Sequence, residues 1–135
     1  MSTKSPIIAL VDDDKVFQLT TLRTIQSAKI TERILQFENG EEALSFLREH
    51  AAETENLPDF IFLDINMPFV DGWMFLDDFA ELKYVLKKEI SIYMVSSSID
   101  PRDVNRAKGN AHVREYIIKP VSREKLIEVL KKAAA

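Results

Sequence analysis

Carboxylate, hydroxyl and ammonium groups come directly after four short apolar segments of this sequence. The residues that carry them are Asp12 and Asp13, Asp64, Ser96, and Lys119. A single Asp at the end of a strand is usually a turn former or a helix cap, so only the five residues together indicate a site. Short unbroken apolar runs predict strands buried on both faces, as in a parallel sheet, and ligands bind at the carboxyl edge of such sheets. We therefore expect these five side chains to converge at one edge.

Three carboxylates at that edge call for a cation. Three carboxylates within about 5 Å of one another would repel by roughly 3 kcal/mol per pair at an effective dielectric constant of 20. Magnesium suits such a site, because it takes one or two carboxylates and leaves coordination positions free for phosphate oxygens. We expect Asp13 and Asp64 to be direct ligands, the backbone carbonyl of Asn66 to be a third, and Asp12 to act through bound water.

A phosphoryl group attached to Asp64 would be held by the remaining two side chains. Lys119 brings an ammonium and Ser96 a hydroxyl, which together could neutralise and grip phosphoryl oxygens. The chain has no Cys and only two His, which excludes a disulfide, a cysteine nucleophile and a thiolate metal site. Any metal must therefore be held by oxygen.

The composition predicts one globular domain. The chain has 135 residues, of which 46% are hydrophobic and 30% are charged, so we expect a single domain over residues 1–135, with a core over about 6–133 and no output domain. The first apolar run, 7–11, is too short for a signal peptide or a membrane span, which makes a cytoplasmic protein the default expectation. The net charge of −4 argues against direct nucleic-acid binding.

Strands and helices alternate along the chain. We expect strands at 7–11, 34–37, 60–63, 90–95 and 116–118, each followed by a helix. The first helix has an apolar stripe at Val16, Leu19, Leu22 and Ile25, and the third has one at Phe75, Phe79, Leu82 and Leu86. Ser122 is placed to cap the last helix. This alternation predicts an α/β fold with a doubly wound five-stranded parallel sheet and helices on both faces.

Five short motifs stand at the predicted strand ends in a recognisable order: Val11-Asp12-Asp13-Asp14, Leu63-Asp64-Ile65-Asn66-Met67-Pro68, Asp71-Gly72, Val95-Ser96 and Tyr116-Ile117-Ile118-Lys119-Pro120. With them the chain strongly resembles the receiver domain of two-component response regulators, over essentially its whole length. The resemblance implies a flavodoxin-like fold with the strand order 2-1-3-4-5, which is also the order in the chemotaxis member of this family.

The resemblance also implies roles for the residues at the sheet edge. Asp64 would be the phosphoacceptor, Asp12 and Asp13 would organise Mg²⁺, and Lys119 would contact the phosphoryl oxygens. Such a protein is not an enzyme in the usual sense, but a phosphoacceptor that assists its own phosphorylation and dephosphorylation.

The expected switch and partners follow from the same resemblance. Ser96 would be the switch hydroxyl, Tyr116 the aromatic side chain that turns inward with it, and the Lys119–Pro120 bond would be cis. The phosphodonor would be a sensor histidine kinase or a histidine phosphotransfer protein. A downstream effector protein would bind the face formed by the fourth helix, fifth strand and fifth helix, and the chain would be a monomer or a weak dimer.

Three other functions deserve comparison with this one. A haloacid-dehalogenase-type phosphatase also uses an Asp nucleophile and Mg²⁺, but it needs a second acid two residues later, where this chain has Asn66. A flavin-binding domain would place its flavin phosphate against a group of Asp side chains, which is electrostatically unfavourable. A pseudo-receiver that binds partners without accepting phosphate remains the main alternative.

Overall fold

A five-stranded parallel sheet forms the centre of the computed structural model, which describes residues 5–134. Its strands lie in the order β2-β1-β3-β4-β5, so the order implied by the family resemblance is confirmed. The elements are β1 (Ile8–Val11), α1 (Lys15–Ser27), β2 (Ile34–Phe37), α2 (Gly40–Glu49), β3 (Phe60–Leu63), α3 (Gly72–Leu82), β4 (Ser91–Ser96), α4 (Pro101–Lys108), β5 (Val113–Ile118) and α5 (Arg123–Ala134).

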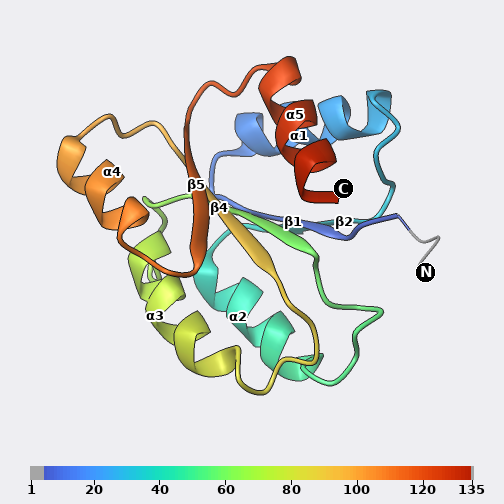
Figure 1. The fold of residues 1–135 in the computed structure, drawn as a ribbon, viewed down its shortest axis with the longest axis vertical. Helices are drawn as coiled ribbons and strands as arrows, with labels where there is room; N and C mark the ends of the chain where they lie inside the picture. The colour runs from blue at the N-terminus through green and yellow to red at the C-terminus, as the bar shows by residue number, and fades with distance from the viewer. Residues whose placement is uncertain (1–4, 135) are drawn as a thin grey trace.

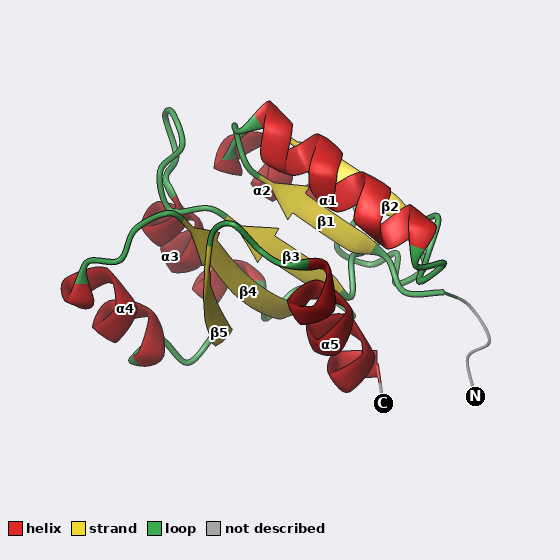
Figure 2. Ribbon diagram, turned by 90° about the horizontal axis from the view of Figure 1, so that it is seen from above, coloured by secondary structure: helices red, strands yellow, loops and turns green. Residues whose placement is uncertain are grey.

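Helices cover both faces of the sheet, as predicted. Figure 1 shows α1 and α5 on one face and α2 and α3 on the other, with α4 beside the edge strand β5. In the view from above in Figure 2, α1 and α5 lie in front of the sheet, and α4 lies to one side beside β5. Within residues 5–134, no helix is both long and apolar enough to cross a membrane.

The central strands are buried on both faces because their side chains alternate between two cores. In β1, Ala9 and Val11 pack in the core beneath α2 and α3, whereas Ile8 and Leu10 pack in the core beneath α1 and α5. All four residues of β1 and of β3 are buried. This two-sided burial explains why both strands are unbroken apolar runs in the sequence.

The predicted apolar stripe of α1 is wrong at its first turns. Val16 and Leu19 are 75% and 47% exposed; Ile25 is buried as predicted, but the residues buried with it are Gln18 and Thr21. The polar Gln18 can lie at the sheet because its amide nitrogen donates to three backbone carbonyls there. A polar side chain with satisfied hydrogen bonds can occupy a buried position, which hydrophobic periodicity does not detect.

The predicted bounds of β1 and β4 are each within one residue of the structure, but two other predicted boundaries differ more. Helix α3 ends at Leu82, so Leu86 packs into the core from the turn that follows rather than from a helix. Strand β5 begins at Val113 and not at 116, because its first half is only partly buried and therefore lacks a continuous apolar run. The capping role of Ser122 is confirmed, since its hydroxyl accepts a hydrogen bond from the backbone N–H of Lys125 at 3.0 Å.

Candidate functional site

Backbone hydrogen bonds bring Asp12, Asp64 and Lys119 to one edge of the sheet. Each is the first residue after its strand, and each donates its backbone N–H to the last residue of a neighbouring strand. The acceptors are in β2 for Asp12, β1 for Asp64 and β4 for Lys119, at 3.0, 3.0 and 2.8 Å. The parallel pairing thus continues one residue beyond three strands, and this directs three charged side chains toward the same space.

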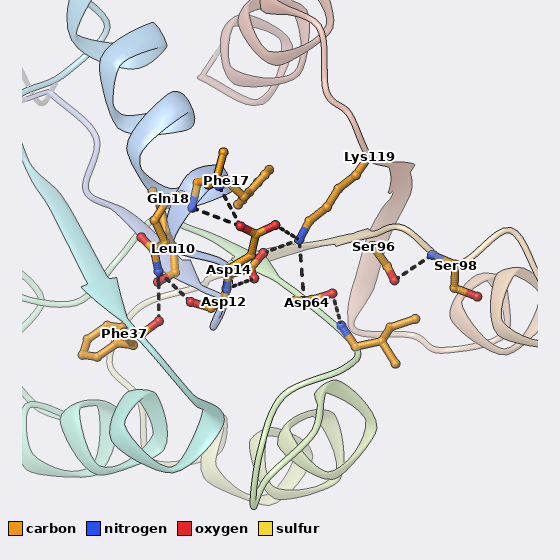
Figure 3. A network of polar contacts seen from close by, with 12 residues as sticks. Leu10, Asp12, Asp14, Phe17, Gln18, Phe37, Asp64, Ser96, Ser98 and Lys119 are labelled. Atoms are coloured by element: carbon orange, nitrogen blue, oxygen red, sulfur yellow. Dashed lines mark hydrogen bonds and ion pairs between the residues drawn. The ribbon is translucent and has the colours of Figure 1, made fainter.

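Carboxylate oxygens of Asp12, Asp13 and Asp64 lie within 4.8 Å of one another, and we call these three residues the acidic cluster. Asp12 and Asp64 are buried, whereas Asp13 is exposed. Figure 3 shows the side chain of Lys119 reaching into this region. Its Nζ lies 2.8 Å from Asp12 Oδ2 and 3.8 Å from Asp64 Oδ2. The ammonium therefore contacts the β1 carboxylate more closely than the expected phosphoacceptor.

Burial and neighbouring negative charge destabilise the charged forms of Asp12 and Asp64. Burial, followed by the charge of Asp12, raises the pKa of Asp64 to about 7 even though Lys119 lowers it. Burial also raises the pKa of Asp12, and this effect outweighs its contacts with Lys119 and Asp14. Burial lowers the pKa of Lys119, but the surrounding carboxylates, Asp12 first, outweigh burial and raise it overall. One ammonium thus leaves the acidic cluster short of positive charge.

Asp14 supports the cluster in two ways. Its backbone N–H donates to Asp12 Oδ1 at 2.9 Å, and its own carboxylate caps α1 by accepting from the N–H groups of Val16 and Phe17. The other oxygen of Asp14 lies 3.7 Å from Lys119 Nζ. A helix cap can be predicted from the sequence next to Asp14, whereas the approach of Lys119 depends on a residue far away in the chain.

Asp64 is positioned by the turn that follows it. Its Oδ1 accepts the backbone N–H of Ile65 at 2.8 Å, which leaves Oδ2 on the side of Lys119. Helix α3 begins directly against this turn: a Cβ atom on Gly72 would lie 2.5 Å from the carbonyl oxygen of Asp64. The Asp-Gly motif seen in the sequence is therefore required sterically, since a larger residue would displace the backbone that carries Asp64.

Gln18 is a supporting residue that the sequence interpretation missed. Its Nε2 donates to the carbonyls of Leu10, Asp12 and Phe37 at 3.2, 3.1 and 3.0 Å, as Figure 3 shows. Its Oε1 accepts from Gln36 at 3.0 Å. One buried amide thereby joins α1 to the ends of β1 and β2. The available signal was its position seven residues before the buried Ile25, on the same side of a helix.

Ser96 and Tyr116 belong to a separate hydrogen-bond network with Ser98 and Asp103, which we call the hydroxyl network. Ser96 is the last residue of β4 and is fully buried, and its Oγ accepts the N–H of Ser98 at 3.1 Å. The hydroxyl of Tyr116 donates to the carbonyl of Ser98 at 2.8 Å. The hydroxyl of Ser98 donates to Asp103 Oδ2 in α4 at 2.6 Å. One loop residue therefore links β4, β5 and α4.

The donor set of the acidic cluster is compatible with Mg²⁺. It consists of oxygen ligands alone, which is what this cation prefers. Asp12 Oδ2 is buried, and although it is ion-paired with Lys119 it accepts no well-directed hydrogen bond. An oxygen in that state still has acceptor capacity for a cation or its water. Asn66 lies exposed two residues after Asp64, and the role of its carbonyl stays a prediction.

The Lys119–Pro120 peptide bond is cis, as the family resemblance implied. All seven residues proposed for the site lie at or beside the carboxyl edge, six of them in two groups. The acidic cluster and Lys119 form the first group, Asn66 lies in the adjoining turn, and Ser96 and Tyr116 belong to the hydroxyl network.

Comparison with known proteins identifies the family. The sequence model of the response regulator receiver domain matches residues 8–131. The chain is 32% identical over 120 residues to the probable methanogenesis regulatory protein FilR2 of Methanothrix harundinacea, covering 89% of this chain and 76% of that protein. It is 29% identical over 128 residues to the chemotaxis protein CheY of Listeria monocytogenes, covering 93% of this chain and 96% of that protein.

The structural comparison agrees with the sequence matches. The fold superposes on a two-component response regulator from Cytophaga hutchinsonii with a TM-score of 0.85 and 30% identity, covering 97% of this chain and 98% of the other. Some relatives are much longer, including a sensor histidine kinase of which this chain spans 15%. These matches cover nearly the whole described structure and include its site. The chain belongs to the response regulator receiver domain family.

Proposed function

We propose that this protein is a phosphorylation-controlled receiver in which Asp64 accepts a phosphoryl group in a Mg²⁺-dependent reaction. The observation that carries the proposal is the position of Asp64, a buried carboxylate that shares its surroundings with two acids and an ammonium. Receiver domains are typically signalling modules rather than enzymes, and the reaction proposed here modifies the protein itself.

The side chains of Asp12, Asp13 and Asp64, with the backbone carbonyl of Asn66, would hold the cation. Bound Mg²⁺ would supply positive charge that balances the carboxylates and the incoming phosphoryl oxygens. This charge is needed because Asp64 must be ionised to act as a nucleophile, and its pKa near 7 leaves much of it protonated at neutral pH without a cation. The reaction therefore depends on the charge balance of the acidic cluster.

A carboxylate oxygen of Asp64 would attack the phosphorus of a phosphohistidine. An oxygen–phosphorus bond forms while the phosphorus–nitrogen bond breaks, and its electron pair goes to the donor imidazole, which takes a proton from water. Oδ2 is the favoured nucleophile, since Oδ1 already accepts the N–H of Ile65. Lys119 lies 3.8 Å from Oδ2 and would pair with the phosphoryl oxygens as they develop charge.

Phosphorylation would act on the hydroxyl network through Ser96. The group at position 64 would change from about −1 to about −2 in charge and gain acceptor oxygens. A hydroxyl that turns to donate to those oxygens would change its contact with Ser98, which is bonded to both Tyr116 and Asp103. This route would connect the phosphorylation site to α4 and β5 and shift a pre-existing equilibrium between two arrangements.

The partners we propose are a sensor histidine kinase or a histidine phosphotransfer protein as donor, and an effector protein that binds the face of α4, β5 and α5. Charge supports a distinct docking region there, because residues 102–135 carry nine Lys and Arg against four Asp and Glu, while the whole chain has a net charge of −4.

Intact mass spectrometry after incubation with acetyl phosphate and Mg²⁺ tests the proposal. We expect the protein to gain the mass of one phosphoryl group, and Asp64→Asn to gain none. Asp71→Asn is the matched control, because Asp71 caps α3 outside the acidic cluster and Asn can also cap a helix. No gain in the unsubstituted protein would favour a pseudo-receiver, and a gain in Asp64→Asn would assign the phosphoryl group to another residue.

A further inference from the structure

A second candidate site lies at the opposite end of the sheet from Asp64. It is a cavity of about 600 Å³ between the C-terminal half of α3, the segment that leads into β4, and the start of β5. Ser91 and Val113, the first residues of β4 and β5, are among its walls. Because all the strands are parallel, these walls lie at the amino ends of the strands, whereas the acidic cluster lies at the carboxyl ends.

The inner wall of this cavity is apolar and aromatic. Phe79, Leu86 and Ile90 contribute side chains that are buried in the core beneath α2 and α3. The imidazole of His112 meets the ring of Phe79 edge-on, with the ring centroids 5.8 Å apart. Burial, and then the nearby Lys83, lowers the pKa of His112, which favours the neutral form of this imidazole. A flat ring of a ligand could pack against such a wall.

The rim of the cavity carries positive charge that the protein does not neutralise. Lys83, Lys87 and Arg114 line it, and among the described residues none of them is ion-paired with a carboxylate. Lys88 is already paired with Asp59 at 3.1 Å. Glu89 is the one acidic residue among those that line the cavity. The lining of this cavity therefore carries four basic residues against one acidic residue.

We propose that this cavity binds a phosphate monoester that carries a ring system, with the size of a mononucleotide. The three unpaired cations would hold the phosphate, and the wall of Phe79 and His112 would take the ring. The volume lies within the range of small-molecule sites in proteins, roughly 300–1,000 Å³. The site is distinct from the phosphorylation site, because it shares no residue with the acidic cluster or the hydroxyl network.

Isothermal titration with adenosine monophosphate tests this proposal. The buffer contains a chelator, so that no divalent cation can join the nucleotide to the acidic cluster. We expect adenosine monophosphate to bind about tenfold more tightly than inorganic phosphate or adenosine alone, since each of these keeps only half of the contacts. Equal affinity for the nucleotide and inorganic phosphate would show that the apolar wall does not bind the ring. If the nucleotide does not bind at all, the whole proposal is wrong.

Substitutions then locate the binding. Lys83→Ala and Arg114→Ala are each expected to weaken nucleotide binding about tenfold through the loss of one charged contact. Lys131→Ala is the matched control, since it removes the same charge from an exposed position of α5 on the other face of the sheet. Both substituted rim residues are exposed, so thermal unfolding should show intact folding. Unchanged affinity in both rim variants would contradict the proposed location.

Discussion

The acidic cluster and the hydroxyl network lie at the same edge of the sheet but satisfy their polar groups differently. In the acidic cluster, three carboxylates share one lysine, and Asp12 Oδ2 accepts no well-directed hydrogen bond. In the hydroxyl network, Ser98 uses its N–H, its carbonyl and its hydroxyl in hydrogen bonds to three different residues. One group has charge left to be balanced, whereas the other is internally satisfied.

This difference separates two tasks within one site. Buried like charges raise the free energy of the folded protein until a cation or a proton arrives, so the acidic cluster favours binding of a ligand. A satisfied hydrogen-bond network instead favours one arrangement of the loop and of α4. Substitutions in the acidic cluster should therefore change stability in ways that depend on pH and Mg²⁺, and substitutions in the hydroxyl network should not.

The largest effect is expected for Lys119→Met. Removing the ammonium leaves the buried Asp12 without its counter-charge, so the free energy of unfolding should fall by about 3 kcal/mol at pH 8 without metal. The deficit should shrink at pH 5, where the carboxylates can take protons. Urea titration measures both values. Lys125→Met, which breaks the partly exposed pair with Glu115 at 2.6 Å, is the control and should cost less than about 1 kcal/mol. Similar losses in the two variants would remove the case for a special charge balance at Asp12.

The second effect concerns Asp64 and pH. Its pKa is about 7 in the folded protein against an ordinary value of 3.8, so the folded state binds more protons between these values. The contribution of Asp64 to stability is therefore fully present below about pH 4 and is lost as the pH rises through 7. Asp64→Asn should stabilise the metal-free protein by about 2 kcal/mol at pH 8 and flatten this pH dependence. Chemical denaturation across pH 4–8 gives the comparison, and a destabilised Asp64→Asn protein at pH 8 would contradict it.

Smaller losses are expected in the hydroxyl network. Tyr116→Phe removes the hydrogen bond to the Ser98 carbonyl, and Ser98→Ala removes the one to Asp103. Each substitution should lower the free energy of unfolding by about 1 kcal/mol. The pH dependence of stability and the Mg²⁺ affinity should not change. Urea and Mg²⁺ titrations of both variants measure these quantities. A tenfold loss of Mg²⁺ affinity in either variant would show that the two groups are not separate.

The smallest effect is spectroscopic. Trp73 is 8% exposed, follows Gly72 at the start of α3, and has the guanidinium of Arg106 in α4 at 4.4 Å from its ring. We expect its fluorescence to change when Mg²⁺ binds, because Gly72 contacts the backbone of Asp64. Asp13→Asn should shift the change to higher Mg²⁺ concentration. A constant emission up to saturating Mg²⁺ would mean that the acidic cluster does not act on α3.

Much of the fold, and the gathering of polar residues at the carboxyl edge of the sheet, could be predicted from the sequence. Two-sided burial makes β1 and β3 unbroken apolar runs, and the residues that follow such strands must lie at one edge of a parallel sheet. The predictions of element bounds and buried residues failed where a strand is only partly buried or where a polar side chain is buried. Strand β5 lies at an edge and lacks a clear run in its first half. Helix α1 buries Gln18 and exposes Val16, because hydrogen bonds replace apolar packing there.

The residue types and their order along the chain determined the alternating α/β fold, the chemistry at the carboxyl edge and the need for a cation. Only the tertiary structure decided that Lys119 lies closer to Asp12 than to Asp64, that Ser98 joins three elements, and that unpaired cations of β5 and of the segment after α3 line one cavity. The physical reason is the distance along the sequence over which each kind of interaction acts. Burial leaves a periodic pattern within a segment, whereas hydrogen bonds and ion pairs depend on side chains that come together only when distant segments fold.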